Sequence, residues 1–402
     1  MLNVKRLFQP VNIYFVLWSL YRLQGPLYPS GSIISKVLLL IILLWSFCIM
    51  FRVNTKVRSL PRFIYAVNLF LLVSTLYGTL LIISGQELYI TEGIYRRASN
   101  FDYLKKIYMS LLPIYVFFYY TLKRSLTSRH IMFYSICLLL ICIANYIHGR
   151  TEALLMALEM GYSTEGVTLN VGYSFLAVIP LLIYWNKRSA VQFALLILTM
   201  LFIMICVKRG AILIGAICSV YFLFNAIRNS SRHKRIIVVL LSLFTVLAAW
   251  WFVIDMLNSN GYFVYRIEET LAGDSSNRDI LYSTYWNHFL SETNFLRFLF
   301  GNGANATLKI GMNFAHNDWL ELVINNGILG IVIYAFYFIA LYKDSIVAKR
   351  IDNIHYGVIL LAFIIIFCSS LFSMSYASIN IAITIALGFS LGSVQIKCLQ
   401  NQ

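Results

Sequence analysis

Long apolar runs separated by short polar segments recur along the whole chain. A helix needs about 20 mostly apolar residues to cross the hydrocarbon core of a bilayer, and the longer runs meet this length. Only helices or closed barrels satisfy their backbone hydrogen bonds in lipid, so these runs predict helices. The predicted spans are 11–24, 33–51, 63–84, 106–122, 130–147, 171–185, 190–207, 211–227, 236–254, 317–342, 355–372 and 378–396. The pattern therefore predicts an all-α, polytopic integral membrane protein with about 12 transmembrane helices in a single domain, 1–402.

Composition supports this class, because 60% of the residues are hydrophobic and only 12% are charged. A soluble protein carries about 25% charged residues. The net charge of +16 would suit a nucleic-acid-binding protein, but its distribution argues against that partner. With the N-terminus inside, 19 of the 32 Lys and Arg residues but only 2 of the 16 Asp and Glu residues fall in inside segments. This bias is the positive-inside rule, and it predicts that both termini are cytoplasmic.

The longest polar segment, 255–316, lies outside between spans nine and ten, and long loops of this kind are usually functional. Ser276 and Asp279 have the spacing of a capping box, which predicts a helix there. We expect an amphipathic helix at the membrane surface, with its aromatic side, including Tyr285, towards lipid. Arg278 stands in its first turn, where free N–H groups and a guanidinium favour a phosphate. The alternative is that Arg278 pairs with Asp274 or Asp279.

The chain re-enters the membrane at the segment FAHNDWLELVINNGILG. His316 and Asn317 stand at this entry, and Glu321 follows one turn later. An imidazole at this position is suited to general base catalysis, although a lone histidine is more often an ordinary interfacial residue. Five positions separate His316 from Glu321, which does not place them on one helix face for a shared metal. No metal site is expected.

Further cations are predicted at the outer surface. Residues 190–227 would extend roughly 57 Å as one helix, far beyond a bilayer core, so the chain must turn at Lys208, Arg209 and Gly210. We expect Gly210 to permit the turn.

Basic residues in outer loops run against the usual bias, and an anionic ligand would explain them. The alternatives are lipid headgroups and acidic neighbours. The outer-loop arginines are Arg96, Arg97 and Arg150.

Together these motifs resemble the O-antigen polymerase and ligase superfamily. The resemblance covers 170–342 and rests on an Arg-Gly turn, an arginine opening an aromatic helix, a Gly-x-Gly turn, and His-Asn-x-x-Leu-Glu before Gly-x-x-Gly. The family's outer-loop arginine falls on Arg278, its motif histidine on His316 and its turn arginine on Arg209. The chain departs from many relatives at 325–326, where Asn-Asn precedes Gly327 and an acidic residue is common.

The resemblance implies a glycosyltransferase of the bacterial inner membrane that acts on undecaprenyl-diphosphate-linked oligosaccharides at its outer face. Arg278 and His316 would be catalytic, and Asn317 and Glu321 supporting. No cofactor is implied, since the diphosphate leaving group supplies the activation. A polymerase of repeat units, with a chain-length regulator and a flippase as possible partners, is expected before a ligase that transfers the chain to lipid A core. A flippase is less favoured, because no span carries a central charge. The residues expected to bind the diphosphate are Lys208, Arg209, Arg150, Arg96 and Arg97.

Overall fold

A computed structural model describes residues 8–84, 100–159, 168–259, 261–271, 278–311 and 313–400. Its elements within these ranges are all helices, and the described residues form no strand beyond one isolated bridge between Gln24 and Tyr28. The all-helical class predicted from the apolar runs is confirmed.

The helices follow the predicted spans closely, and several differ from them in length. The first half of the chain contains α2 (Pro10–Arg22), α3 (Ile33–Lys56), α4 (Arg62–Ile83), α5 (Asn100–Leu111), α6 (Pro113–Leu122), α7 (Ser128–Glu159), α8 (Gly172–Leu176), α9 (Ile179–Leu182), η2 (Ile183–Trp185) and α10 (Ser189–Ile205). The second half contains α11 (Arg209–Arg228), α12 (Arg232–Ser259), α13 (Gly261–Leu271), α14 (Arg278–Leu290), α15 (Phe295–Phe300), α16 (Ala306–Ile310), α17 (Asp318–Ile351), α18 (Asn353–Phe372) and α19 (Ile381–Gln400).

Eight helices in the described part of the chain are long and apolar enough to cross a membrane: α3, α4, α7, α11, α12, α17, α18 and α19. The apolar segments 172–185 and 189–205 are shorter, and α2 has only 13 residues. The structure therefore supports a membrane-embedded helical protein, and the count of twelve spans stays a prediction.

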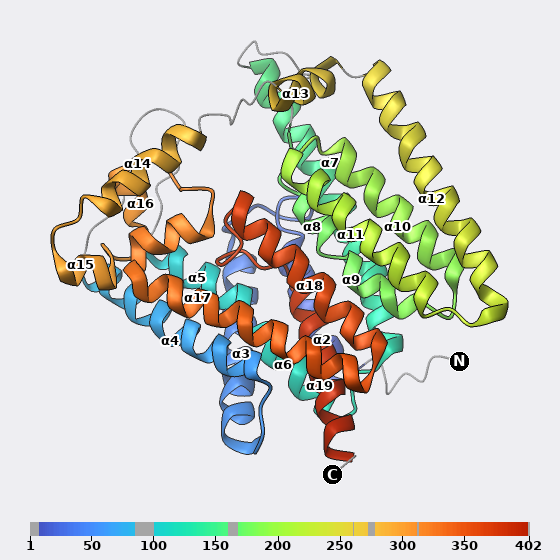
Figure 1. Cartoon of the computed structure of the whole chain (residues 1–402). Coiled ribbons are helices and arrows are strands. Elements are labelled where there is room, and N and C mark those ends of the chain that lie inside the picture. Colours follow the sequence, from blue (N-terminus) through green and yellow to red (C-terminus); the bar gives the residue numbers. More distant parts are fainter. Residues whose placement is uncertain are drawn as a thin grey trace.

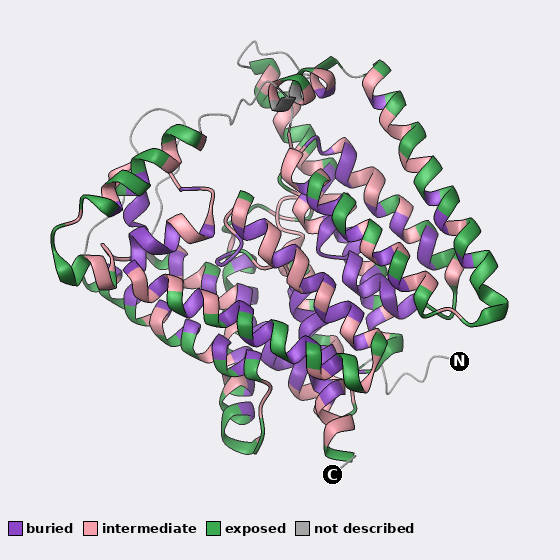
Figure 2. Ribbon diagram, in the orientation of Figure 1, coloured by how far each residue is buried: buried purple, intermediate pink, exposed green. Residues whose placement is uncertain are grey.

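The core lies where α6, α17, α18 and α19 meet, and α17 also packs along α4 (Figure 1). The outer helices are apolar on their exposed sides instead. α12 is exposed along most of its length, as Figure 2 shows, and presents Leu240, Leu247, Trp250 and Trp251. An apolar surface of this extent is unusual on a water-soluble monomer and is suited to lipid.

α17 is broken once, at Gly327, whose φ of 64° and ψ of −156° lie outside the helical range. The break leaves carbonyl groups of the preceding turn without their helical partners. Backbone N–H groups of Asn302 and Gly303 donate to Ile324 and Asn325 at 2.9 Å and satisfy them. The two backbone segments approach so closely that a Cβ on Gly327 would lie 2.5 Å from the carbonyl carbon of Leu299. The Gly-x-Gly turn and Gly327 are thus two halves of one backbone contact.

The helices α14, α15 and α16 pack against α17 (Figure 1). A small apolar cluster holds it there, formed by Tyr285, Phe289, Ala306, Ala315, Val323 and Ile324. Tyr285 is fully buried, and its hydroxyl donates to the carbonyl of Asn313 at 2.7 Å. The expectation that Tyr285 faces lipid was wrong, because that face of α14 meets protein. Trp286 and Leu290, on the other side, are exposed.

A buried carboxylate ties the start of α17 to the segment that follows α18. Asp318 accepts hydrogen bonds from the backbone N–H groups of Ser375 at 2.8 Å and Tyr376 at 3.0 Å. It also accepts from the hydroxyls of Tyr334 and Ser375. Four donors offset the cost of burying this carboxylate. They fix residues 373–376 beside the entry of α17.

Candidate active site

A cavity of about 740 Å³ lies among α2, α5, the start of α8, the start of α14 and the end of α18. Among the described residues that line it there are five cations and no carboxylate. The cations are Arg22, Lys105, Lys106, Lys208 and Arg278. His316 lines the same cavity, together with serine and asparagine side chains from 369–380. A hollow with this lining is suited to an anionic ligand that also carries hydroxyl groups.

Arg278 is the first residue of α14, as the sequence predicted. The capping box proposed for Ser276 lies outside the described residues. The guanidinium reaches across the cavity, where Nη1 donates to the carbonyl oxygen of Phe372 at 3.1 Å. The Arg278 side chain is half-buried, and its position beside the last turn of α18 leaves other N–H groups for a ligand.

His316 occupies the turn that precedes α17 and has a φ of 52°, which is unusual for a residue other than glycine. The next residue, Asn317, caps α17 by accepting from the N–H groups of Trp319 and Leu320. Its amide nitrogen donates to the carbonyl of Leu371 at 3.2 Å. Asn317 therefore supports His316 by fixing this turn against α18.

Two cations of the cavity lower the pKa of His316. Burial lowers the pKa of its imidazole below the usual value, and the positive charges of Arg278 and Lys208 lower it further. The imidazole is consequently neutral at pH 7 and has a nitrogen that can accept a proton. These three side chains form one electrostatic group, which we call the His316 group: Lys208, Arg278 and His316.

Glu321 does not line the cavity and is fully buried behind it. Its carboxylate accepts hydrogen bonds from the Thr307 hydroxyl at 2.5 Å, from the Ala315 N–H at 2.9 Å and from the Asn325 amide at 3.0 Å. Because Ala315 directly precedes His316, Glu321 is a positioning residue for the imidazole.

The predicted turn between α10 and α11 exists, but the residue that adopts a positive φ there is not the expected glycine. Val207 adopts the positive φ of 49°, whereas Gly210 lies within α11. A Cβ on Gly210 would lie 2.4 Å from the hydroxyl oxygen of Tyr173, which also lines the cavity. Gly210 is therefore required for close packing at the cavity wall, and the turn does not depend on its flexibility.

Two of the other predicted diphosphate-binding cations, Arg209 and Arg150, do not line the cavity. Arg209 forms an ion pair with Glu269 of α13 at 3.9 Å, and it does not line the cavity. Arg150 is exposed on α7 and donates to the Tyr146 hydroxyl at 2.8 Å. Arg96 and Arg97 lie outside the described residues. Of that predicted set, the structure brings Lys208 together with Arg278 and His316.

Sequence reasoning missed the cations Arg22, Lys105 and Lys106, and it missed the segment 373–380. A signal for the cations was present, since all three lie at outer ends of predicted spans, where basic residues are unusual. The serines of 373–380 gave no comparable signal, because short polar turns between spans are common.

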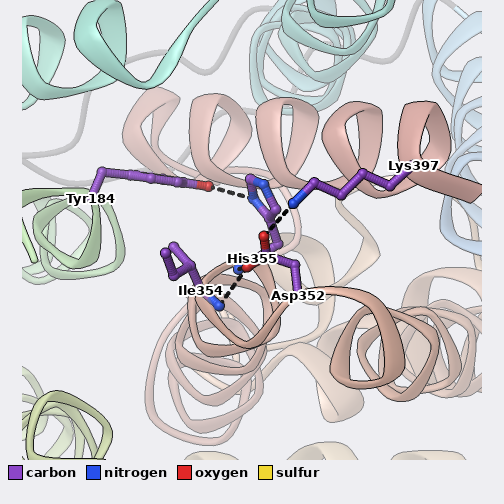
Figure 3. A network of polar contacts seen from close by, with 5 residues as sticks. All are labelled: Tyr184, Asp352, Ile354, His355 and Lys397. Atoms are coloured by element: carbon purple, nitrogen blue, oxygen red, sulfur yellow. Dashed lines mark hydrogen bonds and ion pairs between the residues drawn. The ribbon is translucent and has the colours of Figure 1, made fainter. Parts of the chain in front are cut away.

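A second polar cluster lies at the other end of α18 (Figure 3). Asp352 caps α18 and forms an ion pair with Lys397. The buried His355 contacts the Tyr184 hydroxyl through Nδ1 at 3.1 Å. Some five turns of helix separate His355 from the cavity end of α18, so this cluster ties η2, α18 and α19 together and takes no part in the cavity.

In the described part of the chain no three His, Cys, Asp or Glu side chains are grouped in a way that could hold a metal ion. A search of protein-family models finds no match to this chain, and no curated protein matches it.

Proposed function

We propose that this protein is a membrane glycosyltransferase that polymerises undecaprenyl-diphosphate-linked oligosaccharide repeat units at the outer face of the bacterial inner membrane. The observation that carries the proposal is the His316 group, in which a neutral imidazole and two cations share one cavity whose described lining contains no carboxylate. The membrane-embedded helices around it suit a substrate with a lipid carrier. A separate flippase would supply that substrate, and a chain-length regulator would limit the product.

The cations act on the leaving group. When the bond between the anomeric carbon and the carrier diphosphate breaks, negative charge develops on the departing oxygen. Arg278 and Lys208 are fixed in the cavity wall before the reaction, and preorganised charges of this kind stabilise the transition state most effectively. The guanidinium suits a phosphate because its N–H groups can bind two oxygens at once.

The imidazole acts on the incoming glycan. A sugar hydroxyl of the acceptor attacks the anomeric carbon of the donor, and its proton passes to the neutral His316. A glycosidic bond forms, the carbon–oxygen bond to the diphosphate breaks, and undecaprenyl diphosphate leaves with the bonding electrons. The lowered pKa of His316 keeps the imidazole in the neutral form that can accept this proton.

Reconstitution tests the proposal. The purified protein in lipid nanodiscs should convert a defined undecaprenyl-diphosphate oligosaccharide into a ladder of longer chains. Arg278→Ala and His316→Ala should abolish the ladder, while Lys187→Gln, a change at an exposed position that does not line the cavity, should leave it unchanged. Ladders of normal length from both alanine variants would refute the assignment.

A ligase that transfers finished chains to lipid A core needs the same cations and base, so the His316 group supports it equally. The lipid that accumulates in a deletion strain separates the two functions. Loss of a polymerase leaves single repeats on the core, whereas loss of a ligase leaves long chains on the carrier.

A further inference from the structure

The α2 side of the cavity carries charge that the donor diphosphate does not use. Arg278 and Lys208 belong to the His316 group, and a diphosphate esterified at both ends carries about two negative charges, one for each phosphate. These two cations match the charge of the donor. Arg22 at the end of α2 and Lys106 on α5 line the same cavity with no donor charge opposite them, and they remain for the acceptor.

Arg22 has no carboxylate partner among the described residues. Its guanidinium lies 5.4 Å from the centre of the Trp18 ring, one helical turn earlier, and this contact orients it. A half-buried cation without a counter-charge is unfavourable for folding, so its presence needs another reason. A ligand that is absent from the folded protein alone would provide one.

Trp18 gives a second and independent sign of a ligand. Its side chain is 4% exposed and lines the cavity, and its buried indole N–H has no hydrogen-bond partner among the described residues. Buried polar groups are almost always paired, so an unpaired donor beside a cation indicates a missing acceptor. An anionic oxygen would accept from the indole and from the guanidinium together.

Lys106 brings a further charge to this side. Its ammonium lies 5.5 Å from the centre of the Phe314 ring, which places it towards the loop that carries His316. Arg22, Lys106 and the His316 group therefore line one cavity. Lys105, its neighbour, is already paired with Asp102.

Resting on the proposed function, we propose that Trp18, Arg22 and Lys106 form a second anion-binding subsite, the α2 subsite. It holds a negatively charged group of the acceptor glycan, either a carboxylate of an acidic sugar or a phosphate. The enzyme thus selects anionic glycans, and the α2 subsite orients the acceptor while the His316 group holds the donor diphosphate.

Direct binding tests the subsite without any need for turnover. Calorimetry on the detergent-purified protein would compare four probes: a glucuronate-containing disaccharide, its neutral glucose counterpart, methyl phosphate and inorganic diphosphate. We expect the wild type to bind the acidic disaccharide more tightly than the neutral one. Arg22→Gln should weaken this binding about tenfold or more, the scale of a charge-assisted hydrogen bond. Trp18→Phe should weaken it less, since only the N–H is lost.

Matched variants distinguish the two subsites. Arg278→Gln should weaken diphosphate binding and leave the acidic disaccharide unaffected, and Lys187→Gln should change neither. If Arg22→Gln weakens methyl phosphate and leaves the glucuronate probe unaffected, the group held at the α2 subsite is a phosphate. Equal binding of acidic and neutral disaccharides, with methyl phosphate unaffected by Arg22→Gln, would overturn the subsite.

Kinetics separates this proposal from the proposed function. In the nanodisc reaction, Arg22→Gln should raise KM for a charged acceptor and leave kcat nearly unchanged. An active wild type with an unchanged KM in Arg22→Gln would refute the subsite alone. A wild type that makes no ladder but binds the anionic probes through Arg22 would refute the proposed reaction alone. Arg22→Lys, which keeps the charge, serves if Arg22→Gln does not fold.

Discussion

Arg278 donates a hydrogen bond to the carbonyl oxygen of Phe372, although 94 positions separate the two residues. The last carbonyls of a helix have no partner within the helix, and Phe372 ends α18. Asn317 binds the neighbouring carbonyl of Leu371 in the same way. The end of α18 therefore holds both the start of α14 and the start of α17, and this common anchor brings Arg278 and His316 to one cavity.

The guanidinium of Arg278 should matter beyond its charge. Arg278→Lys keeps the positive charge but loses the planar set of donors, and one lysine cannot bind Phe372 and a phosphate in the same geometry. We expect a loss of about 10²-fold in the rate of chain extension, similar to the loss of one oxyanion donor elsewhere. Single-turnover rates in nanodiscs measure it. Full activity in Arg278→Lys would show that charge alone suffices.

The rate of chain extension should fall at acidic pH. The reaction needs the neutral imidazole, and the pKa of His316 is lowered, so the neutral form dominates at pH 7 and is lost only below the usual histidine range. Rates should be flat from pH 7 upwards and fall about tenfold per pH unit well below pH 6.5. In Lys208→Gln one of the charges that lowers this pKa is gone, so the acid limb should move to higher pH. An unmoved limb in pH–rate profiles would exclude His316 as the titrating base.

Glu321 and Thr307 should act as one unit. Glu321→Leu and Thr307→Val each remove one partner of their hydrogen bond, and each should reduce kcat by loosening the turn before His316. A double-mutant cycle on thermal unfolding should give a coupling energy of about 0.5–3 kcal/mol. Additive effects would mean that the two side chains act separately.

Gly327 should not tolerate a side chain. Gly327→Ala would force alanine to adopt a positive φ and would place its Cβ against the backbone of Leu299. The turn at 301–303 holds this backbone in place, so the contact cannot be relieved. We expect a loss of about 1–3 kcal/mol in the free energy of unfolding. Gly261→Ala, where nothing lies within 4 Å of the new Cβ, is the control and should stay within about 0.5 kcal/mol. Equal melting temperatures for both variants would contradict the close contact.

The predicted orientation can be checked by labelling. In a cysteine-free background, a thiol at the exposed position of Thr293→Cys should react with an impermeant maleimide on intact spheroplasts. Lys187→Cys, on the loop between η2 and α10, should react only after the membrane is opened. Labelling of Lys187→Cys from outside, with no labelling of Thr293→Cys, would invert the assignment of the 19 basic inside residues.

The sequence predicted the helices well, because an apolar run in lipid has few alternatives to a helix. It could not predict which neighbour each face meets. Tyr285 has the spacing of a surface aromatic, yet its face is covered by α16 and α17, a contact between distant segments. Arg22 likewise reaches the cavity only because α2, α5 and α18 close around it. Gly210 marks a close approach of Tyr173, which local turn preferences do not reveal.

The break at Gly327 has a consequence for how deep in the membrane the reaction takes place. The hydrogen bonds from Asn302 and Gly303 lock the segment before His316 to a fixed point on α17, and the rest of that helix continues for 24 residues to Ile351. The imidazole thus keeps a constant distance from the break along the axis of α17. In the proposed reaction, a carrier whose diphosphate lies at the level of the headgroups would meet the base without leaving its leaflet.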